Sequence, residues 1–343
     1  MFTNSGITGN RILRLILIGI CIALVLLSCA EKEKKSIGEF ERIDPALDEI
    51  VSKNAKIQII AEGFDWTEGP LWIEDKKMLL FCDIPPNTIY KWTEEKGQEL
   101  YLTPSGYTGT QARTGEPGSN GLTLNSKGQL VLCQHGDRKI ALMDAALDSP
   151  KPKFITLADS YSGKKFDSPN DLVFLKNGDL YFTDPPYGLE QNAADPKKEA
   201  PYQGVYKLTP EGKVVLLIDT ITRPNGIAFF PDEKTMLVAN SDSMSKKWYA
   251  YDLGSGDSLI NPRIFYDATE AGKKDKGAPD GLKIDKKGNV FASGPGGVWI
   301  FDKNAKLLGK IKIPEFVSNV ALANDDKTLY VTADMYVLKI DLR

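Results

Sequence analysis

The chain has 343 residues, a formal net charge of −3 and 26% charged side chains. This composition is typical of a soluble globular protein, and a weakly acidic chain without a dense basic patch is a poor candidate for binding nucleic acid. Length alone would allow two domains, so the pattern along the chain has to decide the architecture.

The first residues predict export. Arg11 and Arg14 precede an apolar run from Leu15 to Leu27, and a basic start followed by a short apolar core is the pattern of a signal peptide. The run is too short to span a bilayer comfortably. It ends in Leu-Leu-Ser-Cys, which resembles a bacterial lipobox, so Cys29 is the expected site of lipidation.

We therefore expect three parts: a lipoprotein-type signal peptide over residues 1–29, a charged tether over 30–43, and a folded domain over 44–343. The protein would be exported to the cell envelope and held on a membrane by its lipid alone. The alternative is a plain cleaved signal or a weak membrane anchor.

One short phrase then recurs six times. Each copy is a turn, an apolar strand, a polar turn and a second apolar strand, and each opens with a carboxylate or an amide. The copies begin at Glu68, Asn120, Asn170, Asn225, Asp280 and Asn319. Their starts are 52, 50, 55, 55 and 39 residues apart. A strand-and-turn repeat of this length predicts an all-β fold, a six-bladed β-propeller with one blade per copy.

The last copy supplies only three strands. Residues 56–62 (KIQIIAE) have the apolar content of a strand, and we expect this N-terminal strand to pair with the last blade and close the ring. Before it, Asp44-Pro45 predicts a short helix through about Ser52, because Asp caps helices and Pro suits their first position.

The predicted topology places the phrase-opening residues on one rim of the central channel, together with the residues just after the second strands. Two long insertions emerge near this rim, and loops of such length often carry function. The first insertion is Pro104–Ser119 and the second is Pro185–Gln203.

Four of the rim residues suggest a metal site: Glu68, Asn170, Asn225 and Asp280 offer two carboxylates and two amide oxygens. Such hard ligands suit Ca²⁺ first, with Mg²⁺, Mn²⁺ or Zn²⁺ as alternatives for one divalent cation. Asn-Gly and Asp-Gly pairs are also ordinary turn residues, so a purely structural role is the competing interpretation. Cysteine spacing does not resemble a zinc site, and Cys82 and Cys133 are expected to be buried and unpaired.

The repeated phrases also resemble the gluconolactonase family, which includes regucalcin (senescence marker protein) and luciferin-regenerating-enzyme-like proteins. The likeness runs from about residue 44 to the C-terminus and rests on TEGPLW (67–72), SNGLTL (119–124), SPNDLVF (168–174), TDPPYG (183–188), RPNGIAFFPD (223–232) and PDGLKID (279–285). It implies a six-bladed propeller with one catalytic divalent metal in its channel. By this resemblance Glu68, Asn225 and Asp280 are metal ligands, and Asn170 binds metal or substrate.

These parts predict a hydrolase that opens sugar lactones to aldonic acids, in which a metal polarises the carbonyl and an activated water attacks it. Asp280 is the first candidate for the general base and His135, the only histidine, is the second. Candidate substrate-binding residues are Asn120, Asn170, Asp184, Tyr187 and Arg113.

Two alternatives stay open. The same site would also suit another ester or a phosphotriester, and a surface propeller could bind a partner without catalysis, with calcium only bracing the channel. Nothing in the sequence predicts an oligomer, so we expect a monomer acting on a small-molecule lactone.

Overall fold

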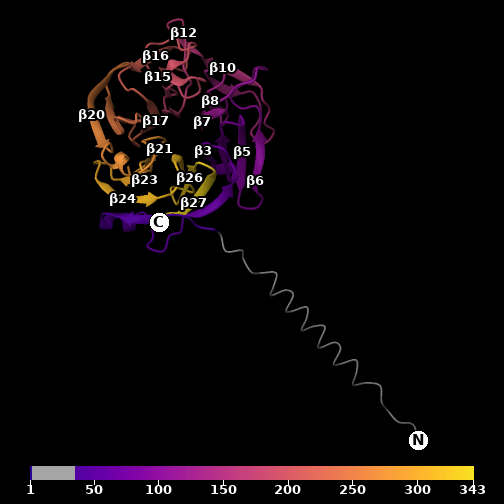
Figure 1. Ribbon diagram of the computed structural model, residues 1–343, viewed down its shortest axis with the longest axis vertical. Helices are drawn as coiled ribbons and strands as arrows, with labels where there is room; N and C mark the ends of the chain where they lie inside the picture. The colour runs from indigo at the N-terminus through magenta and orange to yellow at the C-terminus, as the bar shows by residue number, and fades with distance from the viewer. Residues whose placement is uncertain (2–34) are drawn as a thin grey trace. The chain divides into compact units, whose positions relative to one another are not determined.

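Six antiparallel sheets surround a central channel in the computed structural model (Figure 1). The structure describes Met1 and residues 35–343, so the predicted signal peptide and Cys29 lie outside the described residues. The predicted six-bladed, all-β propeller is confirmed. Within residues 35–343 no helix has the length and apolar content needed to cross a bilayer.

Each blade runs outward from the channel in chain order. Blade one consists of β3 (Thr67–Ile73), β4 (Met78–Asp83), β5 (Thr88–Thr93) and β6 (Gly97–Leu102). Blade two consists of β7 (Ser119–Leu124), β8 (Leu130–Gln134), β9 (Lys139–Met143) and β10 (Phe154–Ala158). Blade three consists of β13 (Leu172–Phe174), β14 (Leu180–Asp184), β15 (Gly204–Leu208) and β16 (Val214–Ile218). A small hairpin, β11 (Ser160–Tyr161) and β12 (Lys164–Lys165), joins blades two and three.

The second half repeats this plan. Blade four consists of β17 (Pro224–Phe229), β18 (Thr235–Asn240), β19 (Lys247–Leu253) and β20 (Leu259–Asp267). Blade five contains β21 (Leu282–Ile284), β22 (Val290–Gly294), β23 (Gly297–Phe301) and β24 (Leu307–Lys312). Blade six contains β25 (Val317–Ala323), β26 (Thr328–Ala333) and β27 (Tyr336–Asp341).

The ring closes through the N-terminal segment, as predicted. Strand β2 (Gln58–Glu62) pairs antiparallel with β27, with Ile59 opposite Leu338. An additional strand, β1 (Glu39–Arg42), pairs with β24 as a fifth strand of blade five. The folded unit therefore begins at Ser36 rather than at residue 44, and the end of the expected tether belongs to the propeller.

The predicted short helix is present, but it is a 3₁₀ helix over Pro45–Glu49 and ends before Ser52. Asp44 caps it as expected, because its Oδ1 accepts a hydrogen bond of 2.9 Å from the backbone N–H of Ala46. Leu47 on this helix is fully buried among the side chains of blades five and six. Three further 3₁₀ segments occur among the described residues: Glu74–Lys76, Asn192–Ala194 and Ala271–Lys273.

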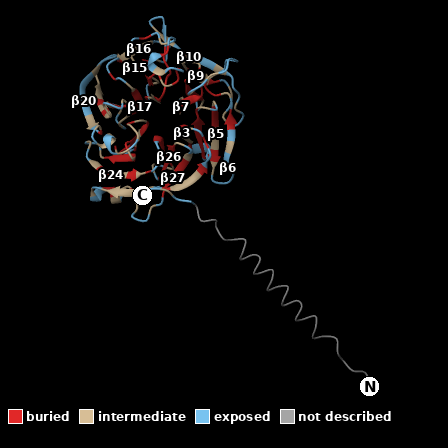
Figure 2. Cartoon of the chain, viewed as in Figure 1, coloured by how far each residue is buried: buried red, intermediate tan, exposed pale blue. Residues whose placement is uncertain are grey.

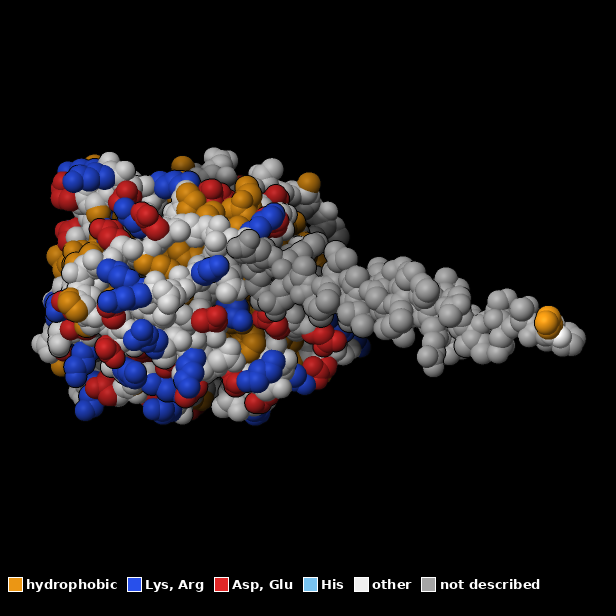
Figure 3. Space-filling view, turned by 90° about the horizontal axis from the view of Figure 1, so that it is seen from below, with side chains coloured by type: hydrophobic (Ala, Val, Ile, Leu, Met, Phe, Trp, Pro, Cys, Tyr) orange, Lys and Arg blue, Asp and Glu red, His pale blue; other side chains and the backbone are white. Residues whose placement is uncertain are grey.

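The core lies between neighbouring blades and is formed mainly by the inner strands (Figure 2). Every residue of β4 is buried, whereas most of β20, at the outside of blade four, is exposed. Cys82 and Cys133 are buried and unpaired, as expected. Figure 3 shows side chains of both charge signs interspersed on the face that it views.

Candidate active site

The phrase-opening residues lie close together because glycine is the next residue in most copies of the phrase. A Cβ on Gly69 would lie 1.9 Å from the carbonyl oxygen of Asn120, and one on Gly226 would lie 2.3 Å from that of Asp280. At Gly69 and Gly226 glycine therefore lets the inner strand approach the opening residue of the next blade, because any side chain there would collide with backbone. The Asn-Gly pairs serve the packing between blades as well as local turns.

This packing creates a cavity of about 370 Å³ at the rim of the channel. Five phrase-opening residues, each from a different blade, line it: Glu68, Asn120, Asn170, Asn225 and Asp280. The sixth, Asn319, supports the wall by donating from Nδ2 to Glu68 Oε2 over 3.3 Å. The two insertions contribute Glu116 and Tyr187.

Several oxygen atoms in the cavity have no hydrogen-bond donor. Asn120 Oδ1, Asn225 Oδ1 and Asp280 Oδ1 are buried and unpartnered. The Asn225 amide is oriented by Ser241, whose Oγ accepts from Asn225 Nδ2 over 3.0 Å and donates to the carbonyl of Pro279 over 2.6 Å. Buried acceptors without donors are costly, and a cation among them would satisfy all three.

The two carboxylates make the cavity strongly electronegative. Burial raises the pKa of Glu68 to about 8, and the nearby charge of Asp171 adds to the effect. Burial and the charge of Glu68 hold the pKa of Asp280 well above its ordinary value. Both pKa values are raised because burial and the neighbouring acids disfavour the charged carboxylates. Carboxyl groups with strongly shifted pKa values in a cavity are candidates for a functional role.

The donor set fits a hard cation. Among residues 35–343 no three His, Cys, Asp or Glu side chains group in a metal-binding arrangement, so the two carboxylates depend on amide oxygens for further ligands. Two carboxylates and several neutral oxygens match the ligand chemistry of Ca²⁺.

Comparison with known proteins identifies the family of the chain. The pattern of the SMP-30/Gluconolactonase/LRE-like region matches residues 66–334. A gluconolactonase from Zymomonas mobilis is 37% identical over 312 residues, which cover 89% of this chain and 86% of that protein. The chain belongs to the SMP-30/gluconolactonase/LRE-like family.

Solved structures of this family share the fold. A gluconolactonase from Xanthomonas campestris superposes with a TM-score of 0.77 at 27% identity and covers 92% of this chain and all of that one. A regucalcin from Agrobacterium tumefaciens, described as a calcium-binding protein, has a TM-score of 0.65 at 17% identity and covers 83% of this chain and 93% of that one. At 17% identity, the similarity to the regucalcin supports the fold only.

Three of the predicted site residues of this family member do not line the cavity. Asp184 accepts hydrogen bonds from the backbone N–H groups of Asp167 and Ser168, over 2.9 and 2.7 Å, and so fixes the approach to blade three. Arg113 donates to the carbonyls of Gly136 and Gly188 and binds the two insertions together.

The third residue outside the cavity wall is His135. It is fully buried, and its Nδ1 lies 3.3 Å from Oε2 of Glu116, which does line the cavity. The histidine therefore contacts the glutamate but does not itself line the cavity. Glu116 was not among the predicted site residues, because a single acid in a Gly-rich insertion carries no sequence signal of its role.

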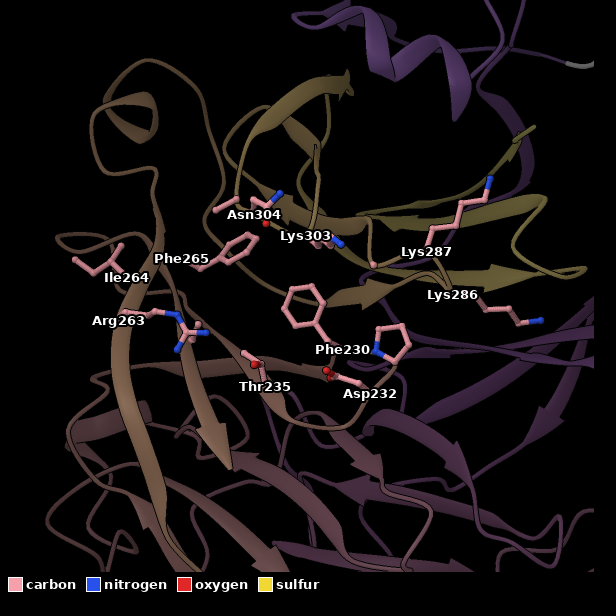
Figure 4. A pocket seen from close by; sticks show the side chains of 14 residues that line it. Phe230, Asp232, Thr235, Arg263, Ile264, Phe265, Lys286, Lys287, Lys303 and Asn304 are labelled. Atoms are coloured by element: carbon pink, nitrogen blue, oxygen red, sulfur yellow. The ribbon is translucent and has the colours of Figure 1, made fainter. Parts of the chain in front are cut away.

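A larger cavity of about 570 Å³ lies elsewhere, between blades four and five (Figure 4). Its wall includes Phe230, Phe265 and the exposed Lys303, and its Arg263 is paired with Asp252 at 2.9 Å. Converging buried polar groups mark a functional site better than size does, so the rim cavity is the candidate active site.

Proposed function

We propose that this protein is a metal-dependent hydrolase that opens sugar lactones to aldonic acids. The observation that carries the proposal is the convergence of oxygen-bearing side chains from five blades on one cavity, with three oxygens buried and unpartnered. The relatives support the reaction, because a gluconolactonase at 37% identity covers most of the chain. A lactone is a cyclic carboxylic ester, so the protein is a hydrolase of carboxylic esters.

Glu68, Asn225 and Asp280 would hold the cation, with Asn120 or Asn170 completing the set. Their two charges balance one dication, and Ca²⁺ suits the oxygen ligands. When bound, such a cation polarises an ester carbonyl and stabilises the negative charge that develops on its oxygen.

The chain's own residues supply the rest of the chemistry. Asp280 is the general base: it accepts a proton from the attacking water while the water oxygen bonds to the carbonyl carbon. The bond from that carbon to the ring oxygen then breaks, and the ring oxygen takes the proton to become a hydroxyl. Asp280 is favoured over His135 because its carboxylate lines the cavity, whereas the imidazole is fully buried behind Glu116.

Other cavity residues orient the substrate. Asn120 and Asn170 carry amide groups that can pair with hydroxyl or carbonyl groups of a sugar lactone. Tyr187 reaches the cavity from the second insertion, and burial, together with the charge of Asp280, raises the pKa of its phenol. Tyr187 therefore stays protonated and able to donate a hydrogen bond.

The test is hydrolysis of D-glucono-1,5-lactone, with acid release followed by a pH indicator. We expect activity with Ca²⁺, loss of activity with a chelator, and loss in Asp280→Ala. Asp232→Ala is the matched control, because Asp232 lines the larger cavity and is exposed. Wild-type activity no faster than spontaneous hydrolysis would reject this substrate.

A second candidate keeps the site and changes the substrate. The ligands would serve other esters or phosphotriesters equally, so a substrate screen with the same Asp280→Ala control separates the two. If the chelated protein were merely less stable and no substrate were found, the non-catalytic binding role would gain support.

Export and lipidation belong to the same proposal. Cys29 comes directly after an apolar segment that ends in Leu-Leu-Ser. Incorporation of a labelled fatty acid into the wild type, and its loss in Cys29→Ser, is the expected result. Equal labelling of both proteins would refute the assignment.

A further inference from the structure

Glu116 is the only acidic side chain in the first insertion, and it enters the wall of the rim cavity. Its carboxylate is one of the charges that raise the pKa of both Glu68 and Asp280. Yet these three acids do not form a metal-binding group within residues 35–343. Glu116 therefore lines the same cavity as Glu68 and Asp280 without forming a three-acid metal cluster with them.

The first insertion is a fixed wall. Asn87 Oδ1 accepts from the backbone N–H groups of Ser105, Gly106 and Tyr107 over 3.1, 2.7 and 3.1 Å. Farther along, the backbone N–H of Gly118 donates to the carbonyl of Ile84 over 3.0 Å. The beginning and end of the insertion are thus both anchored to the loop after β4.

The middle of the insertion is anchored as well. Thr108 donates from its backbone N–H to Asp137 Oδ1 over 3.0 Å and from Oγ1 to Oδ2 over 2.6 Å. Arg113 Nη2 donates to the carbonyl of Gly188 over 2.6 Å, which joins the first insertion to the second. A carboxylate on so constrained a backbone is held in place before any ligand arrives, which favours recognition.

His135 lies beside this carboxylate without a hydrogen bond to it, because both of its ring nitrogens are buried and unpartnered. Its side chain is fully buried, and Nδ1 lies 3.3 Å from Glu116 Oε2. The Glu116 side chain keeps 33% of its surface exposed, so its oxygens remain accessible from the cavity. No hydrogen bond from another described residue to the Glu116 carboxylate competes with a ligand for them.

We propose that Glu116 is a substrate-positioning residue that accepts hydrogen bonds from the ring hydroxyls of the lactone, with the buried His135 packed beside its carboxylate. This positioning role rests on the proposed lactonase function. It implies that the site selects a polyhydroxylated lactone over a lactone without ring hydroxyl groups. A carboxyl acceptor covered by a substrate hydroxyl discriminates strongly between substrates, because a substrate without the hydroxyl leaves that acceptor unpaired.

The test compares two lactones that differ in their hydroxyl groups, D-glucono-1,5-lactone and δ-valerolactone, with Ca²⁺ present. For gluconolactone we expect kcat/KM to fall about 10- to 100-fold in Glu116→Ala, mostly through KM, as the loss of a hydrogen bond to a charged group implies. The isosteric Glu116→Gln should show a smaller fall in the same direction. His135→Gln should raise KM for gluconolactone with little change in kcat.

On δ-valerolactone all three variants should match the wild type, because there is no hydroxyl to position. Glu199→Ala is the control, since Glu199 is an exposed acid on the second insertion that accepts from the backbone N–H of Lys165. If δ-valerolactone is not turned over, the test rests on gluconolactone alone: a rise in KM with little change in kcat supports the positioning role.

The outcomes separate this inference from the function on which it rests. Wild-type protein that hydrolyses neither lactone overturns the lactonase function, and the role of Glu116 falls with it. An active wild type with an unchanged Glu116→Gln, or a variant that loses kcat equally on both lactones, overturns the positioning role alone. The Gln variant keeps the test valid if the Ala variant does not fold.

Discussion

Replacing Gly226 by alanine should damage the stability of the protein and its active site together. The new Cβ would lie 2.3 Å from the Asp280 carbonyl oxygen and 2.8 Å from both Gly281 Cα and Leu282 Cδ2. Two of these three atoms are backbone of the neighbouring blade, so the inner strands of blades four and five have to separate.

The cost can be worked from that geometry. Overpacking of this kind destabilises a protein by about 1–3 kcal/mol. Alanine also restricts the unfolded chain more than glycine does, which offsets about 0.4–1 kcal/mol of that loss. We expect a net loss of about 0–2.6 kcal/mol in the free energy of unfolding, centred on about 1.3 kcal/mol. The same separation moves Asn225 away from Asp280, and misplacement by about 1 Å costs catalysis on the order of 100-fold.

Urea unfolding and lactone hydrolysis, both with Ca²⁺, measure the two effects. Gly128→Ala is the control: Gly128 has φ +71 and no neighbour within 4 Å of an added Cβ. That variant should lose about 1–2 kcal/mol from left-handed backbone strain while keeping full activity. A Gly226→Ala protein with wild-type activity would refute the claim that this glycine sets the spacing of the site.

Three further outcomes are expected from the site and the core. Ser241→Ala frees the Asn225 amide and should weaken dication binding about 10- to 100-fold by calorimetry; unchanged affinity would show that Ser241 does not orient the ligand. Because the pKa of Glu68 is raised to about 8, a proton competes with the cation below that pH. The affinity for a dication should therefore fall as the pH drops from about 8 to about 6. An affinity independent of pH over this interval would contradict the raised pKa. Burial raises the pKa of the Cys82 and Cys133 thiols, so both should react with a thiol reagent only after unfolding, and rapid labelling of the folded protein would disprove their burial.

The repeat made the fold predictable. Each copy pairs two apolar strands around a polar turn, and a copy with only three strands demands a fourth from elsewhere in the chain. The apolar segment KIQII supplied it as β2. Strand β1 was not predicted because its sequence, EFER, is short and mostly charged, which is acceptable at an exposed sheet edge but gives no hydrophobic pattern.

The site was predictable where it coincides with the repeat and unpredictable elsewhere. Glu68, Asn225 and Asp280 share one position in their copies, so their convergence results from the symmetry of the fold. Glu116 occupies an insertion found in one blade only, so no internal comparison reveals it. Asp184 was predicted to bind substrate, but its carboxylate accepts hydrogen bonds from two backbone N–H groups, a contact that only the folded loop creates.

The pairing of β2 with β27 also governs the order in which the chain can fold. Gln58 lies opposite Lys339, and Ser36 bridges to Gln58, so one of the earliest folded segments to be synthesised has its partner among the last. The sheets of blades one to five can form largely from local hairpins, but the ring stays open until β27 is available to pair with β2. Contacts this distant in sequence make folding slow.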